Sequence, residues 1–244
     1  MKVMTESSSG AEAFPAPRGS GAATLTPTYE GDFVLDEPLL LECGRMLTGI
    51  TLHYAVYGRL NAARDNAVLV CHALTGSALV GSWWPEIFGP GGVLSLENDF
   101  AICINMLGSC YGSTGPGSVD PGTGRVYGPD FPLVSVRDNV RAQAQLLDSL
   151  GVRCLRLVLG GSLGGMQALE WPILFPERVL RSLVIAVAPL SAMGLALNHL
   201  QRQAILHDPD WAGGHYPPQR LPRRGLALAR QIGMMSYKSA ELFD

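Results

Sequence analysis

The stretch LRLVLGGSLGGMQALEW, residues 155–171, decides the fold of this 244-residue chain. It passes from an apolar segment typical of a buried strand, through a glycine-rich turn, to a helix-like segment. At the turn lies the pattern G-x-S-x-G, formed by Gly160, Ser162 and Gly164. Glycines two residues before and two after the serine allow the strand and the helix to approach closely. The pattern therefore predicts a sharp bend that presents the Ser162 hydroxyl above the end of the strand.

This order of strand, motif and helix is typical of the nucleophile elbow of the α/β-hydrolase fold, so we predict that Ser162 is a catalytic nucleophile. A competing interpretation is a glycine-rich turn whose serine has no chemical role. An oxyanion needs two donors, and we expect the backbone N–H of Leu74 to pair with that of Leu163. His72 precedes Ser162, whereas this fold runs serine, acid, histidine, so we interpret His72 as a structural loop residue.

Further apolar runs predict more strands of the same sheet. Continuous runs at 67–72, 100–106 and 183–188 indicate strands buried on both faces, and alternating patterns at 33–41 and 50–57 indicate an opening pair. A helix should begin after Ser135, whose partner in a capping box is Asp138. A second helix should run from Leu163 to Trp171, where Pro172 interrupts or ends it. Strands alternating with helices predict an α/β fold, a mostly parallel sheet with helices on both faces.

Three regions are expected along the chain. Residues 1–28 are rich in Ser, Gly, Ala and Pro, which predicts a flexible tail without a secretory signal. Residues 29–190 form the predicted core, and its long Gly/Pro-rich loop at 108–132 is expected to be functional or disordered. Helix-like segments at 192–207 and 224–237 predict that residues 191–244 form a helical cap, which would be incomplete here.

The composition excludes several classes of protein. Hydrophobic residues make up 47% of the chain, which excludes wholesale disorder. A net charge of −3 argues against nucleic-acid binding, and no apolar run reaches the roughly 20 residues of a membrane span. Five widely spaced cysteines indicate reduced, mostly buried thiols in a cytoplasmic protein. The His and carboxylate residues lack ligand spacing, so no metal is expected.

Several motifs in one order resemble the homoserine O-acetyltransferase family, a branch of the α/β-hydrolase fold. They are HALTG at 72–76, NMLGSCYGSTGP at 105–116, FP-x-x-SVRD at 131–138, GGSLGGMQALEW at 160–171 and RQAILHDPDW at 202–211. The resemblance covers the chain from about residue 30 to its end. Leu163 and Tyr111 are modest departures from the family pattern.

The resemblance implies a two-step acyl transfer in methionine biosynthesis. Ser162 would attack the thioester of acetyl-CoA, a co-substrate, and no bound cofactor is implied. The hydroxyl of L-homoserine would then take the acetyl group. The resemblance also makes Arg202 the partner of the amino-acid carboxylate, a role that suits a planar guanidinium. A solvated charge on a helix is the competing interpretation for Arg202. A homodimer formed through the cap helices is implied as well.

The base and the orienting acid of a serine nucleophile are not found in the sequence. The histidines and aspartates after Ser162 follow no recognisable strand, and the resemblance places His207, Asp208 and Asp210 in cap and loop positions. We therefore expect a chain truncated at its C-terminus, without the last strands of the family fold and with little or no activity alone. It should also expose apolar surface at an open strand edge, which favours aggregation.

Alternatives from other classes remain open. The first is an ester or thioester hydrolase of the same fold, with water as acceptor. The second is a relative that uses succinyl-CoA or takes serine as acceptor, because acyl-chain selection depends on few pocket contacts. The third is a non-catalytic remnant, for which a Ser162→Ala substitution would change nothing.

Overall fold

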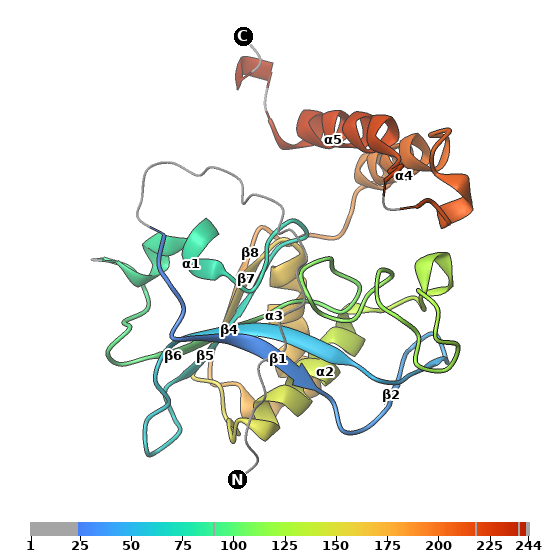
Figure 1. Cartoon of the computed structure of the whole chain (residues 1–244). Coiled ribbons are helices and arrows are strands. Elements are labelled where there is room, and N and C mark those ends of the chain that lie inside the picture. Colours follow the sequence, from blue (N-terminus) through green and yellow to red (C-terminus); the bar gives the residue numbers. More distant parts are fainter. Residues whose placement is uncertain (1–23, 90, 218, 239, 243–244) are drawn as a thin grey trace.

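A computed structural model describes residues 24–89, 91–217, 219–238 and 240–242, and its body is a six-stranded sheet with helices on both faces (Figure 1). The strands of the sheet are β1 (Tyr29–Val34), β4 (Thr51–Gly58), β5 (Ala67–Cys71), β6 (Phe100–Ile104), β7 (Leu157–Gly161) and β8 (Ser182–Ile185). Their order is β1-β4-β6-β5-β7-β8. Strand β5 is parallel to both of its neighbours, β6 and β7, and β7 is parallel to β8. Strand β4 is antiparallel to both of its neighbours, β1 and β6. The predicted mostly parallel sheet is confirmed.

The two central strands explain why both faces need covering. Every residue of β5 and of β6 is buried, as expected for continuous apolar runs. On one face, Leu69 and Cys71 join a core that includes helices α2 (Val136–Ser149) and α3 (Leu163–Leu174). On the other face, Val68 and Val70 pack in a second core beneath the short helices α1 (Val80–Trp83) and η1 (Pro85–Phe88).

The start of α2 confirms the predicted capping box. The Ser135 hydroxyl accepts the Asp138 N–H at 3.1 Å, and the Asp138 carboxylate accepts the Ser135 N–H at 3.0 Å. The same buried carboxylate accepts the Glu42 N–H, so the cap also holds a neighbouring hairpin. This hairpin consists of β2 (Leu39–Leu40) and β3 (Met46–Leu47).

The single strand predicted over 33–41 is wrong. Strand β1 ends at Val34, and residues 39–40 belong to the β2–β3 hairpin instead. Between them lie Asp36, Glu37 and Pro38, residue types that are depleted in strands, and proline in addition lacks a ladder donor. The alternation of apolar residues continues across this break, which is why the pattern alone did not reveal it.

Of the two expectations for Pro172, that it interrupts or ends the second helix, the end is wrong, because α3 continues to Leu174 with Pro172 inside it. A proline at this position removes the N–H that would bond to the carbonyl of Ala168. The Ser182 hydroxyl on β8 donates to that carbonyl at 2.5 Å. A hydroxyl from the sheet thus replaces the lost helical bond.

The ends of the chain differ from the body. Residues 1–23 of the predicted tail lie outside the described residues, whereas the N–H groups of Leu25 and Thr28 bond to Gly81 and Val56 of the body. The predicted tail boundary at residue 28 is therefore too late. After β8, helices α4 (Ala192–Leu206) and α5 (Arg223–Tyr237) form a helical hairpin that stands apart from the sheet in Figure 1.

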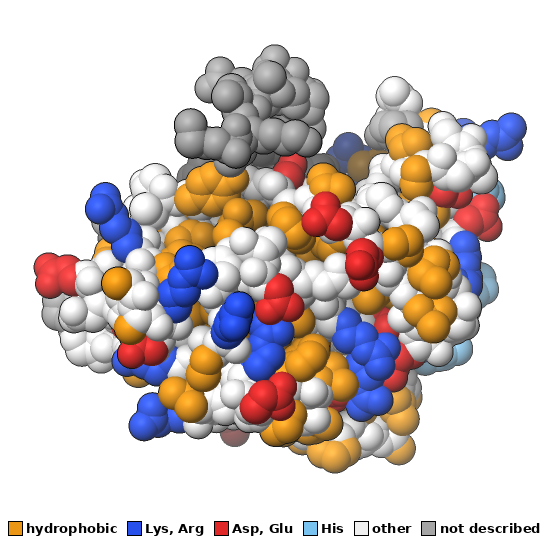
Figure 2. All heavy atoms as spheres, turned by 90° about the horizontal axis from the view of Figure 1, so that it is seen from below, with side chains coloured by type: hydrophobic (Ala, Val, Ile, Leu, Met, Phe, Trp, Pro, Cys, Tyr) orange, Lys and Arg blue, Asp and Glu red, His pale blue; other side chains and the backbone are white. Residues whose placement is uncertain are grey.

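Short 3-10 turns complete the connections: η2 (Gly128–Asp130), η3 (Pro176–Arg178), η4 (Ala212–Gly214) and η5 (Ala240–Leu242). Within the described part of the chain, no helix combines the length and the apolar character that crossing a membrane requires. Figure 2 shows one face of the molecule, on which acidic and basic side chains alternate between hydrophobic patches.

Candidate active site

Ser162 occupies a strained turn between β7 and α3. Its backbone has φ 55° and ψ −121°, and non-glycine residues rarely adopt a positive φ. It is the N-cap of α3, and its side chain belongs to an exposed residue. Its own N–H donates to the Ile185 carbonyl on β8 at 3.0 Å. The sharp bend predicted from the motif is confirmed, and strain of this kind is typical of functional sites.

The glycines of the motif are required by close backbone contacts. A Cβ added at Gly164 would lie 2.0 Å from the Cys71 carbonyl oxygen, and one at Gly160 would lie 2.4 Å from the Gly164 oxygen. At Gly165 an added Cβ would lie 2.5 Å from the side chain of Val187. The first turn of α3 therefore packs directly against the ends of β5 and β7, as the spacing of glycines predicted.

The two predicted oxyanion donors leave the same edge of the sheet. Strands β5 and β7 are parallel neighbours, with Cys71 opposite Gly160, so the loops that carry Leu74 and Leu163 both start at this edge. Neither N–H has a hydrogen-bond acceptor among the described residues. Unpaired N–H groups at a helix N-terminus and a neighbouring loop can stabilise an oxyanion. Their pairing into one oxyanion hole stays a prediction.

His72 is fully buried at the start of this loop, and both ring nitrogens are engaged. Its Nδ1 lies 2.8 Å from the Ala73 carbonyl oxygen, and its Nε2 accepts the Met106 N–H at 3.3 Å. Burial lowers the pKa of the imidazole below its ordinary value, against the opposing effect of the bond to Ala73. A neutral ring with no free nitrogen cannot act as the base of Ser162, which confirms the structural interpretation of His72.

The Gly/Pro-rich loop at 108–132 is ordered. Ser113 and Thr114 are buried, and the Thr114 N–H donates to the Thr51 carbonyl of β4 at 2.8 Å. The Ser113 hydroxyl accepts the His53 N–H and donates to the Asn105 carbonyl. Disorder, one of the two expectations for this loop, is therefore wrong for its described residues, because its backbone is bonded to β4.

The described residues supply no histidine base to Ser162. None of the five histidines of the chain, all of which are described, is hydrogen-bonded to Ser162. His207 bonds to the Gln203 carbonyl within the α4–α5 hairpin. The Asp208 carboxylate accepts the N–H groups of Gly225 and Asp210, and these bonds lower its pKa. These groups hold the hairpin together, as their expected cap and loop positions imply.

Arg202 lies on α4 and is exposed, with no ion-pair partner among the described residues. The hairpin meets the long loop where Gly214 packs against Pro129. Substrate binding by Arg202 stays a prediction.

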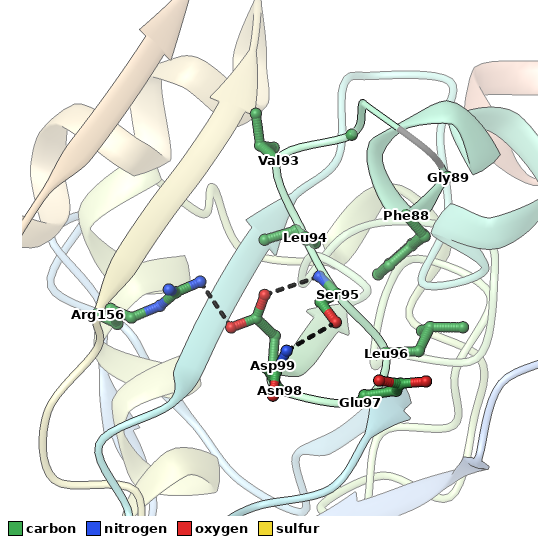
Figure 3. A pocket seen from close by; sticks show the side chains of 11 residues that line it. Phe88, Gly89, Val93, Leu94, Ser95, Leu96, Glu97, Asn98, Asp99 and Arg156 are labelled. Atoms are coloured by element: carbon green, nitrogen blue, oxygen red, sulfur yellow. Dashed lines mark hydrogen bonds and ion pairs between the residues drawn. The ribbon is translucent and has the colours of Figure 1, made fainter.

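A cavity of about 610 Å³ lies at the opposite end of the strands, before β6 and β7 begin. Figure 3 shows it between residues 88–89, residues 92–99 and Arg156, which precede β6 and β7. The Arg156 guanidinium binds the buried Asp99 carboxylate at 2.6 Å, and that carboxylate accepts the Ser95 N–H. Because β6 and β7 are parallel, their first residues are remote from Ser162 at the far end of β7, so this cavity does not belong to the serine site.

The sulfur and metal chemistry of the described residues is simple. All five cysteines are free; Cys71 and Cys103 are buried, as predicted, and burial raises the pKa of both thiols. Cys43 and Cys110 are exposed, so the expectation of mostly buried thiols holds for the sheet but not for the loops. No group of three His, Cys, Asp or Glu side chains in the described part could hold a metal ion.

Comparison with known proteins adds to this geometry. The family model described as the alpha/beta hydrolase fold matches residues 66–242. Homoserine O-acetyltransferase of Symbiobacterium thermophilum is 54% identical over 217 residues, which are 84% of this chain and 57% of the relative. Homoserine O-succinyltransferase of Azoarcus sp. is 53% identical over 216 residues, 84% of this chain and 58% of the relative.

The similar solved structures include both an acetyltransferase and an esterase. Homoserine O-acetyltransferase from Bacillus anthracis is 29% identical with a TM-score of 0.80, covering 86% of this chain and 61% of that one. Esterase E22 has the same identity and TM-score, covering 88% of this chain and 63% of the esterase. The chain spans less than two thirds of the length of these proteins.

Proposed function

From the premise that this chain belongs to the α/β-hydrolase fold family, we propose that its Ser162 carries an acetyl group from acetyl-CoA to the hydroxyl of L-homoserine. The product, O-acetyl-L-homoserine, would serve methionine biosynthesis. The 54% identity to a homoserine O-acetyltransferase supports this activity. Because the chain spans 57% of that relative, the activity belongs to the proposal rather than to the findings.

The observation that carries the proposal is the exposed Ser162 held at φ 55°. In the first step, Ser162 Oγ attacks the thioester carbonyl, and the N–H groups of Leu74 and Leu163 stabilise the oxyanion. The C–S bond then breaks, and CoA leaves as its thiol with the proton from Ser162. An acetyl ester on Ser162 remains.

In the second step, the hydroxyl of L-homoserine attacks the acetyl-serine carbonyl through the same oxyanion hole. The ester bond to Ser162 breaks, and the serine regains a proton. Arg202 would hold the carboxylate of the acceptor by two parallel hydrogen bonds, which directs the other end of the amino acid toward Ser162. Both proton transfers need a general base, which no described histidine provides for Ser162.

Two other activities have specific support. The 53% identity to a homoserine O-succinyltransferase favours a longer acyl donor, and the likeness to esterase E22 favours water as acceptor. Both would use the same elbow and the same oxyanion donors. The sequence motifs do not separate serine from homoserine as acceptor. A non-catalytic role would need no Ser162 hydroxyl at all.

A chimera tests these possibilities. The part of the Symbiobacterium relative that lies beyond the matched segment is fused after this chain, and the Ser162→Ala chimera is the matched control. We expect acetyl transfer to L-homoserine from the chimera, none from the control, and little or none from the 244-residue chain alone. Mass spectrometry of the Ser162 peptide detects the acetyl ester, which avoids interference from the free thiols.

The arms of this assay decide among the activities. Faster reaction with succinyl-CoA would favour the succinyl donor, serine consumption the other acceptor, and acetate release without homoserine the hydrolase. A chimera that folds but gives no Ser162-dependent acyl transfer contradicts the proposal. Turnover by the 244-residue chain alone near that of the chimera would contradict the expectation of an incomplete site.

We further propose that two copies associate through the α4–α5 hairpin, in the cytoplasm, where five free thiols stay reduced. Every residue of α4 is at least partly exposed, although the hairpin is rich in apolar side chains. The exposed ones include Met193, Leu195, Leu200, Leu226, Leu228, Met235 and Tyr237. Light scattering should give a dimer that Leu195→Glu dissociates, and a monomer at all concentrations would contradict this. We expect no nucleic-acid or membrane partner.

A further inference from the structure

We propose that His72 is a positioning residue, which aims the N–H of Leu74 at the reacting carbonyl by holding the peptide unit between Ala73 and Leu74. This inference rests on the proposed function, because it assigns the means by which one oxyanion donor is oriented. His72 is not a member of the expected triad of serine, acid and histidine, and we assign it no contact with the substrate.

The argument begins with one peptide plane. The carbonyl of Ala73 and the N–H of Leu74 belong to the same planar, trans unit, so they point in opposite directions. The Ala73 oxygen accepts two bonds, from His72 Nδ1 at 2.8 Å and from the Gly76 N–H at 2.9 Å. Fixing this oxygen therefore fixes the direction of the Leu74 N–H, which has no acceptor among the described residues.

The bonding partners of His72 leave the ring a single form. A carbonyl oxygen can only accept, so Nδ1 carries the hydrogen, and an amide N–H can only donate, so Nε2 is the acceptor for Met106. His72 is thus neutral with its proton on Nδ1. The other tautomer, or the protonated ring, would lose at least one of the two bonds inside a fully buried site.

The same ring links the oxyanion loop to the helix that carries the nucleophile. Met106, which donates its N–H to His72, accepts a contact from Gln167 Nε2 to its sulfur at 3.0 Å. Gln167 lies on α3, one turn beyond Ser162, and also bonds to Gln143 of α2 at 2.7 Å. These groups are all buried, and their contacts link α3 to the loop that carries Leu74.

Two substitutions separate the two bonds of His72. In His72→Asn the amide nitrogen takes the place of Nδ1 and can still donate to the Ala73 oxygen, but the bond from Met106 is lost. In His72→Gln the amide oxygen takes the place of Nε2 and can still accept from Met106, but the donor to Ala73 is lost. The matched control is His207, whose Nδ1 makes the same bond to a carbonyl, that of Gln203, at 2.9 Å in the hairpin.

In the chimera described above, His72→Gln should slow acylation of Ser162 about 100-fold, the effect of losing one oxyanion donor. His72→Asn should retain the rate to within about tenfold, and His207→Asn and His207→Gln should react like the parent. KM for acetyl-CoA should change little, because the loss falls on the transition state. Equal rates for His72→Gln and the parent would overturn the inference.

NMR of the 244-residue chain gives a readout that needs no activity. We expect the His72 ring to show its proton on Nδ1, and the amide signal of Leu74 to move in His72→Gln but not in His72→Asn. A proton on Nε2 in the parent overturns the inference even if the variants fail to fold. A chimera without Ser162-dependent transfer, with these NMR results as expected, would refute the proposed function and keep the role of His72 in holding this peptide.

Discussion

Two regions of the molecule differ in how far their residues are buried. The inner block, defined as β5, β6, β7, α2 and α3, buries most of its apolar residues on both faces of the sheet. In α2, eight of 14 residues are buried. The outer block, defined as β8, α4 and α5, is different: α4 buries none of its 15 residues, and Leu183 of β8 is 42% exposed.

The difference shows which contacts give Ser162 its backbone geometry. The strained turn at Ser162 is held by contacts of the inner block, above all between Gly164 and the end of β5. The outer block contacts this region through β8, which pairs with β7. In addition, the Ser162 N–H donates to the Ile185 carbonyl, and the Ser182 hydroxyl donates to the Ala168 carbonyl. The turn at Ser162 is therefore closely packed, whereas α4 of the outer block buries none of its residues.

The largest difference in stability between the two blocks should come from shortening the Trp171 side chain. The side chain is fully buried, and its indole N–H donates to Gln143 at 3.0 Å, so Trp171→Ala should cost about 3–5 kcal/mol of the free energy of unfolding. Leu200→Ala in the exposed part of α4 should cost less than about 0.5 kcal/mol. Urea unfolding followed by far-UV circular dichroism measures both, and equal costs would show that the blocks are equally packed.

The same substitution at two glycines should have opposite signs. Gly164→Ala places a Cβ 2.0 Å from the Cys71 oxygen, and this overpacking should destabilise by about 1–3 kcal/mol or prevent folding. Gly194→Ala in α4 meets nothing closer than 3.5 Å and should stabilise by about 0.5–1 kcal/mol, because alanine favours a helix. Thermal unfolding decides the signs. A gain at Gly164 would mean that the elbow is looser than its contacts indicate.

Protonation of His72 at acidic pH should lower the free energy of unfolding. The pKa of its buried ring is lowered in the folded state, so below the ordinary value of about 6.5 the unfolded chain binds the proton more readily. The contribution of His72 to the free energy of unfolding should therefore be fully present above about pH 6.5. Below that pH it should fall by at most about 1.4 kcal/mol per pH unit. Urea unfolding across this range should show the slope, and His72→Asn should remove it. The same slope in that variant would assign the effect to another group.

Loss of the Ser182 hydroxyl should have a smaller effect. Ser182→Ala leaves the Ala168 carbonyl without a donor and should cost about 1 kcal/mol. Pro172→Ala restores the helical N–H, so the same serine substitution should cost less in that background. Ser236→Ala is the control, since this hydroxyl bonds to the Gly233 carbonyl within α5. A double-mutant cycle with no coupling between positions 172 and 182 would contradict this account of the proline.

Much of the fold follows from local pattern. The runs that become β5 and β6 are apolar throughout because both faces of these strands are covered, and the capping box before α2 is a contact between near neighbours. Two errors arose where a distant partner decides the outcome. At Pro172 of α3, the replacement hydrogen-bond donor is Ser182 of strand β8. The break before Leu39 became visible through the pairing of Leu39 with Leu47.

The sequence by itself determined where the sharp turn at Ser162 falls, because G-x-S-x-G leaves few conformations between a buried strand and a helix. It also predicted which loop would face that serine. Tertiary structure alone decided how His72 is used. Its two bonds join residues that are neighbours in space, Ala73 and Met106, and a buried ring that must satisfy both has one tautomer. Burial and hydrogen bonding, which depend on the whole fold, supplied that information.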